Sequence, residues 1–286
     1  MYTVSAYAKL NLSLELTHRR SDGYHEIVSV IQTIGLQDTL NLSLSDEISF
    51  VCSDQTLQTQ ENLVVKAANS LLNSVGGEYG ASIKLDKRIP VASGFGGGSS
   101  DAAATLIALN KLWELNLTKD ELKNIGLSIG SDVPYFIDGG TAMIGGMGNI
   151  VRRLPNLDIK WFLLVIPDFQ ISDKTANAYR HIQNHHFTNG GLTRKLEARL
   201  RSKGDLPPQL IYNTFDNIAS ELYPELQSYW DALRSVGAKE IHLAGSGPSI
   251  YTPVRNKEIG TAMELLLKYR HGLNVVLAQS VYPECI

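Results

Sequence analysis

The sequence predicts an α+β protein with two domains. Apolar and polar residues alternate along residues 10–16, which is the period of a strand with one buried face. Farther along the chain, apolar residues recur at nearly helical spacing over residues 102–113. The 286 residues suffice for one large domain or two of ordinary size, and the composition shifts at residues 152–156. We therefore expect an N-terminal domain at 1–153 and a C-terminal domain at 154–286.

The first half mixes strands with helices. Strands are expected at residues 10–16, 27–34, 40–44, 81–85 and 141–144, and helices at 62–72, 102–113 and 118–129. Thr118 and Glu121 have the spacing of a capping box, which indicates where the last of these helices begins.

The second half begins with an apolar strand at residues 161–166, followed by a helix at 174–182 and a polar loop at 184–191. Further strands are expected at residues 240–243, 250–254 and 274–278, with a helix at 257–269. This order is typical of helices packed on a sheet.

Composition excludes several classes of protein. The net charge of −3 shows no basic bias, so we expect neither nucleic acid nor an anionic membrane as a partner. The two cysteines, Cys52 and Cys285, lie far apart and suggest no disulfide framework, so a reducing cytoplasm is expected. The chain start lacks the pattern of a signal peptide, and no apolar run approaches the length of a transmembrane helix.

A glycine-rich stretch runs from Pro90 to Ala104 and includes four glycines among residues 94–98. Glycines let backbone N–H groups approach an anion closely. A helix beginning at Ser99 or Ser100 would point its positive end at the same place. The stretch therefore predicts a phosphate-binding loop and a nucleotide enzyme.

Other interpretations of this stretch fit less well. A flexible linker would not normally stand between a strand and an apolar helix. A Walker A loop requires a lysine after the glycines, and none follows here. The dinucleotide fingerprint fits Gly94 and Gly96, but its third glycine would fall on Ser99.

The segment from Pro90 to Ala104 resembles the Pro-x-x-x-Gly-Leu-Gly-Ser-Ser-Ala motif of the GHMP kinases. Three more segments resemble one branch of that superfamily, the 4-diphosphocytidyl-2-C-methyl-D-erythritol kinases. They are residues 8–12 (Ala-Lys-Leu-Asn-Leu), residues 20–26 (Arg-Ser-Asp-Gly-Tyr-His-Glu) and residues 130–136 (Gly-Ser-Asp-Val-Pro-Tyr-Phe). The resemblance extends over nearly the whole chain in the same order.

The resemblance implies a ribosomal-S5-like N-terminal domain, a ferredoxin-like C-terminal domain and an active site in the cleft between them. It also implies that ATP, with Mg²⁺, phosphorylates the 2-hydroxyl of 4-diphosphocytidyl-2-C-methyl-D-erythritol in the non-mevalonate isoprenoid pathway. The expected partner is therefore a small cytidine diphosphate, bound by a cytoplasmic monomer or homodimer.

Lys9 and Asp132 are the expected catalytic residues. Asp132 follows a predicted helix, where the helix dipole disfavours an acid, so it has a charged partner, a chemical task or a turn-forming role before Pro134. A lysine in an alternating strand is usually solvated, but the resemblance implies that Lys9 faces the cleft near Asp132. Whether Asp132 is a general base or a positioning group stays open.

The resemblance also assigns the substrate-binding residues. Tyr24 and His25 are expected to hold the cytosine ring by stacking and hydrogen bonds, with Tyr179 closing its other side. Thr175 lies four residues before Tyr179, on the same helical face, and Asn11 matches a substrate-contacting position. An ordinary exposed loop is the alternative interpretation for residues 22–25.

A larger set is expected to bind ATP: Asn62, Leu63, Lys87, Pro90, Gly94, Gly96, Gly97, Gly98, Ser99 and Ser100. Ser99 or Ser100 is expected to reach Mg²⁺ or a phosphate oxygen, although either also suits a helix N-cap. Asn62 and Leu63 fit a helix start and a core position equally, and Lys87 fits a solvated lysine beside Asp86. Residues 242–249 resemble a third glycine-rich motif of the family, or form a simple strand–turn–strand.

Two rival functions are considered. The first is a GHMP kinase that acts on another small alcohol, such as homoserine or a mevalonate derivative; the segment at residues 20–26 argues against it. The second is a silent relative that binds a nucleotide as a sensor, which loss of Asp132 or of the glycines would favour. Neither is lost.

Overall fold

The computed structural model describes residues 1–169 and 174–283, which form two β-sheets flanked by helices. The first sheet has seven strands, in which β3, β4, β2, β1 and β8 lie in that order while β5 pairs with β2 and β6 with β5. Its strands are β1 (Tyr2–Arg19), β2 (His25–Ser45), β3 (Ser49–Cys52), β4 (Gly80–Asp86), β5 (Thr141–Gly145), β6 (Ile150–Arg153) and β8 (Tyr212–Asn213). The α+β prediction is confirmed.

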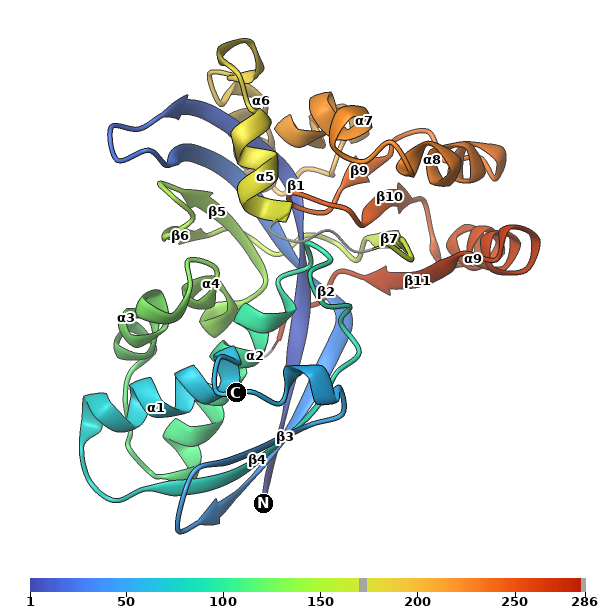
Figure 1. Cartoon of the computed structure of the whole chain (residues 1–286). Helices are drawn as coiled ribbons and strands as arrows, with labels where there is room; N and C mark the ends of the chain where they lie inside the picture. The colour runs from blue at the N-terminus through green and yellow to red at the C-terminus, as the bar shows by residue number, and fades with distance from the viewer. Residues whose placement is uncertain (170–173, 284–286) are drawn as a thin grey trace.

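The long antiparallel pair of β1 and β2 runs the length of the molecule (Figure 1). The strands predicted at residues 27–34 and 40–44 are parts of this single strand β2. The pairing register shifts at Tyr7/Ala8, Asn11/Ser13 and Leu16/His18. Irregularities of this kind bend and twist a strand, so one hairpin can contribute to both ends of the fold.

Four helices cover one side of the first sheet: α1 (Leu63–Val75), α2 (Gly97–Leu112), α3 (Lys119–Ile129) and α4 (Val133–Asp138). Helix α2 lies at the centre of this layer and contacts β1, β2 and the other three helices. Small residues such as Ala102 and Ala103 are buried along α2, which allows the neighbouring elements to pack closely against it. The capping box of Thr118 and Glu121 is present at the start of α3, as predicted.

The second sheet has the order β11–β7–β10–β9 and is antiparallel throughout. Its strands are β7 (Trp161–Ile166), β9 (His242–Leu243), β10 (Ile250–Val254) and β11 (Asn274–Gln279). The predicted bounds of β7 and β10 are confirmed, whereas β9 begins two residues later than expected.

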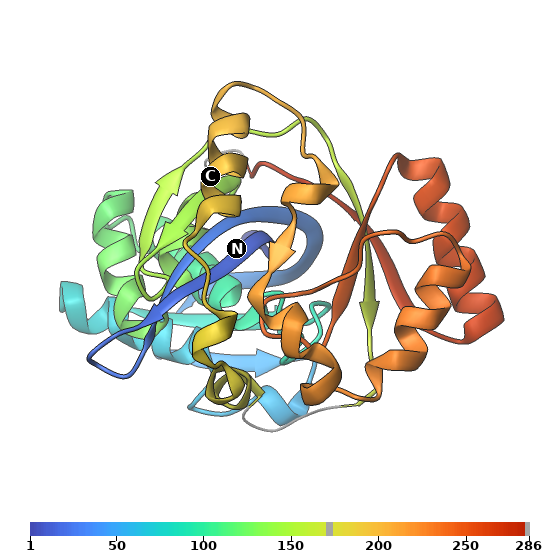
Figure 2. The ribbon, with the colours of Figure 1, turned by 90° about the horizontal axis from the view of Figure 1, so that it is seen from above.

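The remaining helices belong to the second half of the chain. They are α5 (Lys174–His181), α6 (Gly191–Arg201), α7 (Ala219–Leu222), α8 (Leu226–Ser235) and α9 (Lys257–His271). Short 3₁₀ turns complete the elements: η1 (Gln55–Leu57), η2 (Asn184–His186), η3 (Pro208–Leu210) and η4 (Thr214–Ile218). Seen from above, α8 and α9 cover the face of the second sheet that points away from the first (Figure 2).

The two halves are joined by main-chain pairing. Strand β8 from the second half lies parallel to β1, with Ser13 opposite Tyr212 and Leu14 opposite Asn213. A further bridge pairs Ile34 with Ser280. The leucines of β1 also pack against the second sheet, since Leu10 and Leu12 share a core cluster with Phe162 and Leu164. None of the helices in the described ranges is long and apolar enough to cross a bilayer.

Candidate active site

A large cleft of about 1370 Å³ collects residues from both halves of the chain. It is lined by every predicted site residue except Ser100, namely Lys9, Asn11, Tyr24, His25, Asn62, Leu63, Lys87, Pro90, Gly94, Gly96, Gly97, Gly98, Ser99, Asp132, Thr175 and Tyr179. Segments that are distant in sequence therefore meet around one space.

The glycine-rich loop forms one wall of the cleft. Gly94 has a φ of +94° and Gly96 a φ of +75°, in the region that residues with a Cβ rarely adopt. A Cβ on Gly94 would also overlap the carbonyl of Ala244, and one on Gly96 would lie 2.9 Å from the ring of Phe136. Both glycines are thus required by conformation and by close packing.

Helix α2 begins at Gly97, and not at Ser99 or Ser100 as predicted. The reason is that Gly96 serves as its N-cap in a left-handed conformation, so the helix starts directly after the loop. Gly97, Gly98 and Ser99 line the cleft, so the unpaired N–H groups of the first turn lie at its wall. A helix N-terminus in a glycine-rich setting suits a phosphate.

The side chains of Lys9 and Asp132 meet in the cleft. Lys9 Nζ lies 3.9 Å from Asp132 Oδ2 and donates a hydrogen bond of 2.7 Å to Asn11 Oδ1. Burial lowers the pKa of Lys9, and the charge of Asp132 partly opposes this shift. Lys9 is only 6% exposed, so its interpretation as a solvated lysine is wrong.

Asp132 occupies the junction of two helices. It follows α3 and is the N-cap residue of α4, yet its side chain forms no capping hydrogen bond. Asp132 thus lies in the turn between the two helices, but its carboxylate takes no part in a capping hydrogen bond. The side chain is one-third exposed towards the cleft, where it can reach a bound molecule.

Aromatic side chains form another part of the cleft lining. The rings of His25 and Tyr179 lie 5.2 Å apart, and Phe187 lies 5.9 Å from His25. Burial, followed by the charge of Arg19, lowers the pKa of His25, so the neutral imidazole can both donate and accept a hydrogen bond. Tyr24 is 65% exposed at the same cleft. Phe187 was not singled out by the sequence, because it stands in a polar loop.

The turn after β9 also reaches the cleft. Gly245 and Ser246 line it, and the hydroxyls of Ser246 and Thr175 lie 3.2 Å apart. Ala244 N donates to Ser249 O across the turn. The third glycine-rich segment is thus a strand–turn–strand and a cleft wall at once.

Lys174 is a cleft residue that the sequence did not reveal. It is 8% exposed, and its Nζ donates to the carbonyl of Gly247. Burial, followed by repulsion from Lys9, lowers the pKa of Lys174 to about 8. Its proximity to Thr175 was the available signal, but nothing local indicates that a lysine at this position is buried.

Lys87 is held beneath the glycine loop. Its Nζ lies 2.5 Å from Asp38 Oδ2 and 2.8 Å from Asp101 Oδ2, and its side chain is 9% exposed. The solvated interpretation of Lys87 is therefore wrong. Asp38 Oδ1 also accepts the backbone N–H of Ile89 at 2.7 Å, and burial raises the pKa of Asp101 to about 8 although Lys87 opposes the shift. This buried triad anchors the segment that leads into the loop.

The two candidate serines differ in position. Ser100 Oγ donates to Tyr7 O at 2.7 Å and is buried outside the cleft, whereas Ser99 lines the cleft. A Cβ on Gly130 would lie 3.7 Å from Ser99 Oγ, so this hydroxyl adjoins the segment that carries Asp132. In residues 1–169 and 174–283, no cluster of three His, Cys, Asp or Glu side chains is arranged for a metal ion.

The chain is similar to known kinases in sequence. Residues 62–140 match the family described as the GHMP kinases N terminal domain. The chain is 43% identical, over 90% of each chain, to the 4-diphosphocytidyl-2-C-methyl-D-erythritol kinase of Dehalococcoides mccartyi strain BAV1. It is 39% identical to the protein of the same name in Caldanaerobacter subterraneus, over 98% of this chain and 93% of the relative.

Solved structures of kinases superpose on this chain. A crystal structure of 4-(cytidine 5'-diphospho)-2C-methyl-D-erythritol kinase superposes with a TM-score of 0.83 at 27% identity, covering 97% of this chain and 98% of that one. A mevalonate kinase superposes with a TM-score of 0.70 at 17% identity, over 99% and 100% of the two chains. The second likeness shows a shared fold.

Proposed function

Because the chain belongs to the 4-diphosphocytidyl-2-C-methyl-D-erythritol kinases of the GHMP kinase superfamily, we propose that it transfers the γ-phosphoryl group of ATP to the 2-hydroxyl of 4-diphosphocytidyl-2-C-methyl-D-erythritol. This is a step of the non-mevalonate isoprenoid pathway. The observation that carries the proposal is the meeting of Lys9 and Asp132 in one cleft with the N-terminus of α2 and the aromatic rings of His25 and Tyr179.

ATP binds with its phosphates against the glycine loop. The N–H groups at Gly97, Gly98 and Ser99 donate hydrogen bonds to phosphate oxygens, and the positive end of α2 favours the negative charge of the phosphates. Asn62 and Leu63 lie at the start of α1 and line the same cleft, where they contact the adenine. Lys87 supports the loop from below through its two carboxylate partners.

Mg²⁺ is usually bound by one or two protein oxygens together with substrate phosphates and water. The hydroxyl of Ser99 is a hard oxygen ligand at the cleft, so it fits an ion that arrives with the nucleotide. Bound there, the ion would neutralise phosphate charge. Ser100 does not suit this role, because its hydroxyl is committed to Tyr7.

Asp132 orients the acceptor hydroxyl and takes its proton. As the new bond from the hydroxyl oxygen to the γ-phosphorus forms, the bond from that phosphorus to the bridging oxygen of ADP breaks. The proton passes from the hydroxyl to a carboxylate oxygen of Asp132. Lys9, fixed by Asn11, lies beside Asp132 and stabilises charge on the attacking oxygen.

The cytidine half of the substrate occupies the aromatic side of the cleft. Tyr24 and Tyr179 flank the cytosine ring, and His25 hydrogen-bonds its edge. Thr175 and Asn11 add polar contacts from α5 and β1.

Lys174 neutralises phosphate charge from the C-terminal side. Its ammonium is held by the carbonyl of Gly247 close to Lys9, so two positive charges face one cleft. Two buried ammonium groups repel each other, and an anion that lies between them offsets this repulsion. The phosphate groups of the two substrates supply such an anion.

Further properties follow from the family and composition. We propose that residues 1–153 and 154–286 are its two domains, and that the enzyme works in the cytoplasm as a monomer or homodimer. The net charge of −3 supports small-molecule partners rather than nucleic acid or a membrane surface.

The decisive test is ADP release from Mg·ATP and the cytidine diphosphate substrate. Removing the base should lower kcat by about 10²- to 10⁴-fold in Asp132→Asn, and Lys9→Met should lose activity as well. Asp120→Asn removes an exposed acid of α3 that lies outside the cleft and should retain wild-type activity.

Activity that survives in Asp132→Asn would contradict the role of Asp132 as general base, although the protein would still be a kinase. A wild-type protein that binds CDP but releases no ADP would instead be a silent nucleotide-binding relative.

A further inference from the structure

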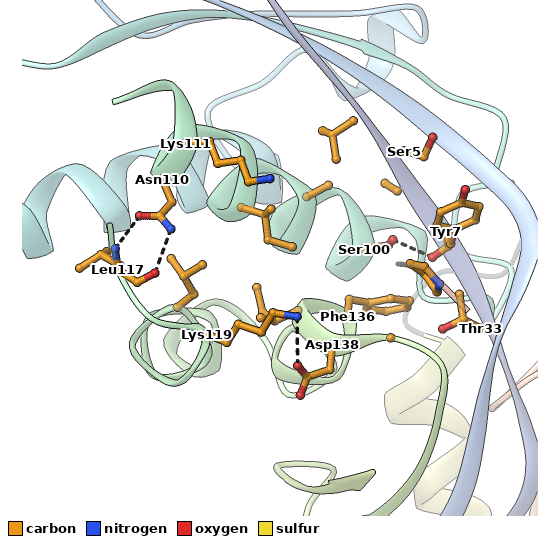
Figure 3. A pocket seen from close by; sticks show the side chains of 18 of the residues that line it. Ser5, Tyr7, Thr33, Ser100, Asn110, Lys111, Leu117, Lys119, Phe136 and Asp138 are labelled. Atoms are coloured by element: carbon orange, nitrogen blue, oxygen red, sulfur yellow. Dashed lines mark hydrogen bonds and ion pairs between the residues drawn. The ribbon is translucent and has the colours of Figure 1, made fainter. Parts of the chain in front are cut away.

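A second cavity of about 610 Å³ lies behind the glycine loop's helix, on the side of α2 away from the active-site cleft. It is enclosed by the start of β1, the helices α2, α3 and α4 and the connection between α2 and α3 (Figure 3). Nothing in the proposed reaction uses it. Its volume falls in the usual range for small-molecule sites, about 300–1,000 Å³.

Sequence spacing on α2 creates the hollow. Ser100, Ala104, Ile107 and Lys111 recur at intervals of three and four residues and all line the cavity. The first two are small, so they leave room where a larger side chain would fill the space between α2 and β1. The stripe ends in Lys111, which places a positive charge at one end of this wall.

The lining divides by chemistry. Apolar side chains come from several elements: Val4, Ala6, Ala104, Ile107, Leu117, Leu122, Phe136 and Ile137. Two ammonium groups, on Lys111 and Lys119, stand on opposite walls and point into the space (Figure 3), and the acidic residues Glu114 and Asp138 line it as well. A site with an apolar interior and a few convergent charges is typical of ligand pockets.

Both lysines are available to a ligand. Lys111 Nζ lies 5.7 Å from the centre of the Tyr2 ring. Lys119 Nζ lies 3.7 Å from Asp138, but that carboxylate is held more closely, at 2.7 Å, by Lys123. An anion between Lys111 and Lys119 would therefore gain two charged donors without leaving Asp138 unpaired.

The cavity is separate from the active-site cleft. The two share none of their lining residues, and Phe136 stands between them with its ring against the position of Gly96. Ser100 closes the partition by donating to the backbone of Tyr7. Occupants of the two spaces therefore need not compete.

We propose that this cavity binds an organic anion with an apolar body, such as a carboxylate, sulfonate or phosphate ester that carries a ring system or a short chain. Its charged group lies between Lys111 and Lys119, and its apolar body packs against Ile107, Leu122 and Phe136.

The test uses 1-anilinonaphthalene-8-sulfonate, an aromatic sulfonate whose fluorescence rises in apolar surroundings. It is titrated into the full chain while saturating ADP and CDP occupy the active-site cleft. We expect one molecule bound per chain. In Lys111→Gln/Lys119→Gln the Kd should weaken about tenfold or more, because two charge-assisted contacts are lost.

A matched control removes two exposed lysines that line neither space, in Lys84→Gln/Lys239→Gln. This variant has the same net charge as the test variant and should bind the probe like the wild type. An unchanged Kd in Lys111→Gln/Lys119→Gln, or an equal loss in the control, would overturn the proposal. So would stoichiometric displacement of the probe by ADP or CDP.

A chain that ends at Pro283, the last described residue lining the cavity, is titrated in parallel. Equal binding by the full and shortened chains supports a site open to an external ligand. The proposal would be overturned if the shortened chain bound the probe and the full chain did not.

Discussion

At the scale of single residues, burial determines what the charged side chains do. Along β1, the polar residues Lys9, Asn11, Ser13 and Glu15 are all at most 6% exposed, although they alternate with leucines as a solvated face would. Both halves of the chain contact this face: Lys9 lies beside Asp132, and Glu15 accepts the backbone N–H of Thr193 at 2.6 Å. A buried charge needs a partner, and each of these side chains has acquired a structural or chemical task.

Lys174 gives a pH prediction. Its lowered pKa of about 8 means that its ammonium loses its proton as the pH rises through 8, so phosphate attraction fades there. We expect kcat/KM for ATP to fall above about pH 8 in the wild type. Lys174→Arg should shift or abolish this fall, because a guanidinium stays charged.

The contribution of Lys174 to folding stability should rise with pH, whereas kcat/KM falls. The unfolded lysine keeps its proton up to its ordinary pKa of 10.5, so the unfolded chain binds more protons between pH 8 and 10.5 and this group favours folding as the pH rises. An alkaline fall in kcat/KM that is identical in Lys174→Arg would assign it elsewhere, with Lys9 as the next candidate.

Lys87 gives a stability prediction. In Lys87→Met the acidic side chains of Asp38 and Asp101, which are 0% and 4% exposed, would lose their shared ammonium partner. Breaking a buried ion pair by removing one partner costs about 3–5 kcal/mol. Urea unfolding should show this loss, while Lys84→Met on the exposed face of β4 should change stability by less than about 0.5 kcal/mol. A loss below about 1 kcal/mol in Lys87→Met would contradict a structural role.

At the scale of elements, the strand–loop–helix from β4 to α2 is the unit that makes the phosphate site. The loop must turn sharply and pack closely against the C-terminal half of the chain. It must also lead into a helix whose first N–H groups have no partner within the helix. Gly94 meets the first two needs and Gly96 caps the helix. A Gly→Ala substitution should therefore change stability by different amounts at different positions of the loop.

We predict that Gly94→Ala and Gly98→Ala differ in stability. Alanine at 94 would have a positive φ and overlap the carbonyl of Ala244, so we expect a loss of more than about 2 kcal/mol together with ATP binding. Alanine at 98 would meet Leu63 at 3.4 Å, an ordinary contact inside a helix, and should fold normally. Thermal unfolding and ADP titration compare the two, and equal stability would show that the loop can rearrange.

At the scale of the whole molecule, the cleft exists because the halves share strands and packing. Strand β8 pairs with β1, and the turn after β9 packs against Gly94, so α5 and the glycine loop face one space. A ligand that bridges the two walls should therefore stabilise the entire fold.

We predict that CDP raises the melting temperature. At 100 times its Kd, a ligand bound only to the folded state adds about 2.7 kcal/mol to the free energy of unfolding. His25→Ala should lose most of the CDP shift and retain the ADP shift, because His25 lies on the aromatic side of the cleft. A CDP shift that His25→Ala leaves intact would refute the cytidine assignment.

The sequence by itself determined the α+β class, the family and the short segments that carry the site. These depend on local order: period-two alternation, a capping box and the succession of glycines are properties of neighbouring residues. For the same reason, the residues that line the cleft could be named from the family resemblance before their arrangement was known.

Only the tertiary structure decided which of these side chains are buried and what each one contacts. Lys87 is paired with Asp38, 49 residues away, and Lys174 with the carbonyl of Gly247, 73 residues away. The start of α2 at Gly97 likewise depends on a loop held against Ala244 and Phe136. Burial and pKa are sums over contacts from distant segments, and local periodicity carries no record of those contacts.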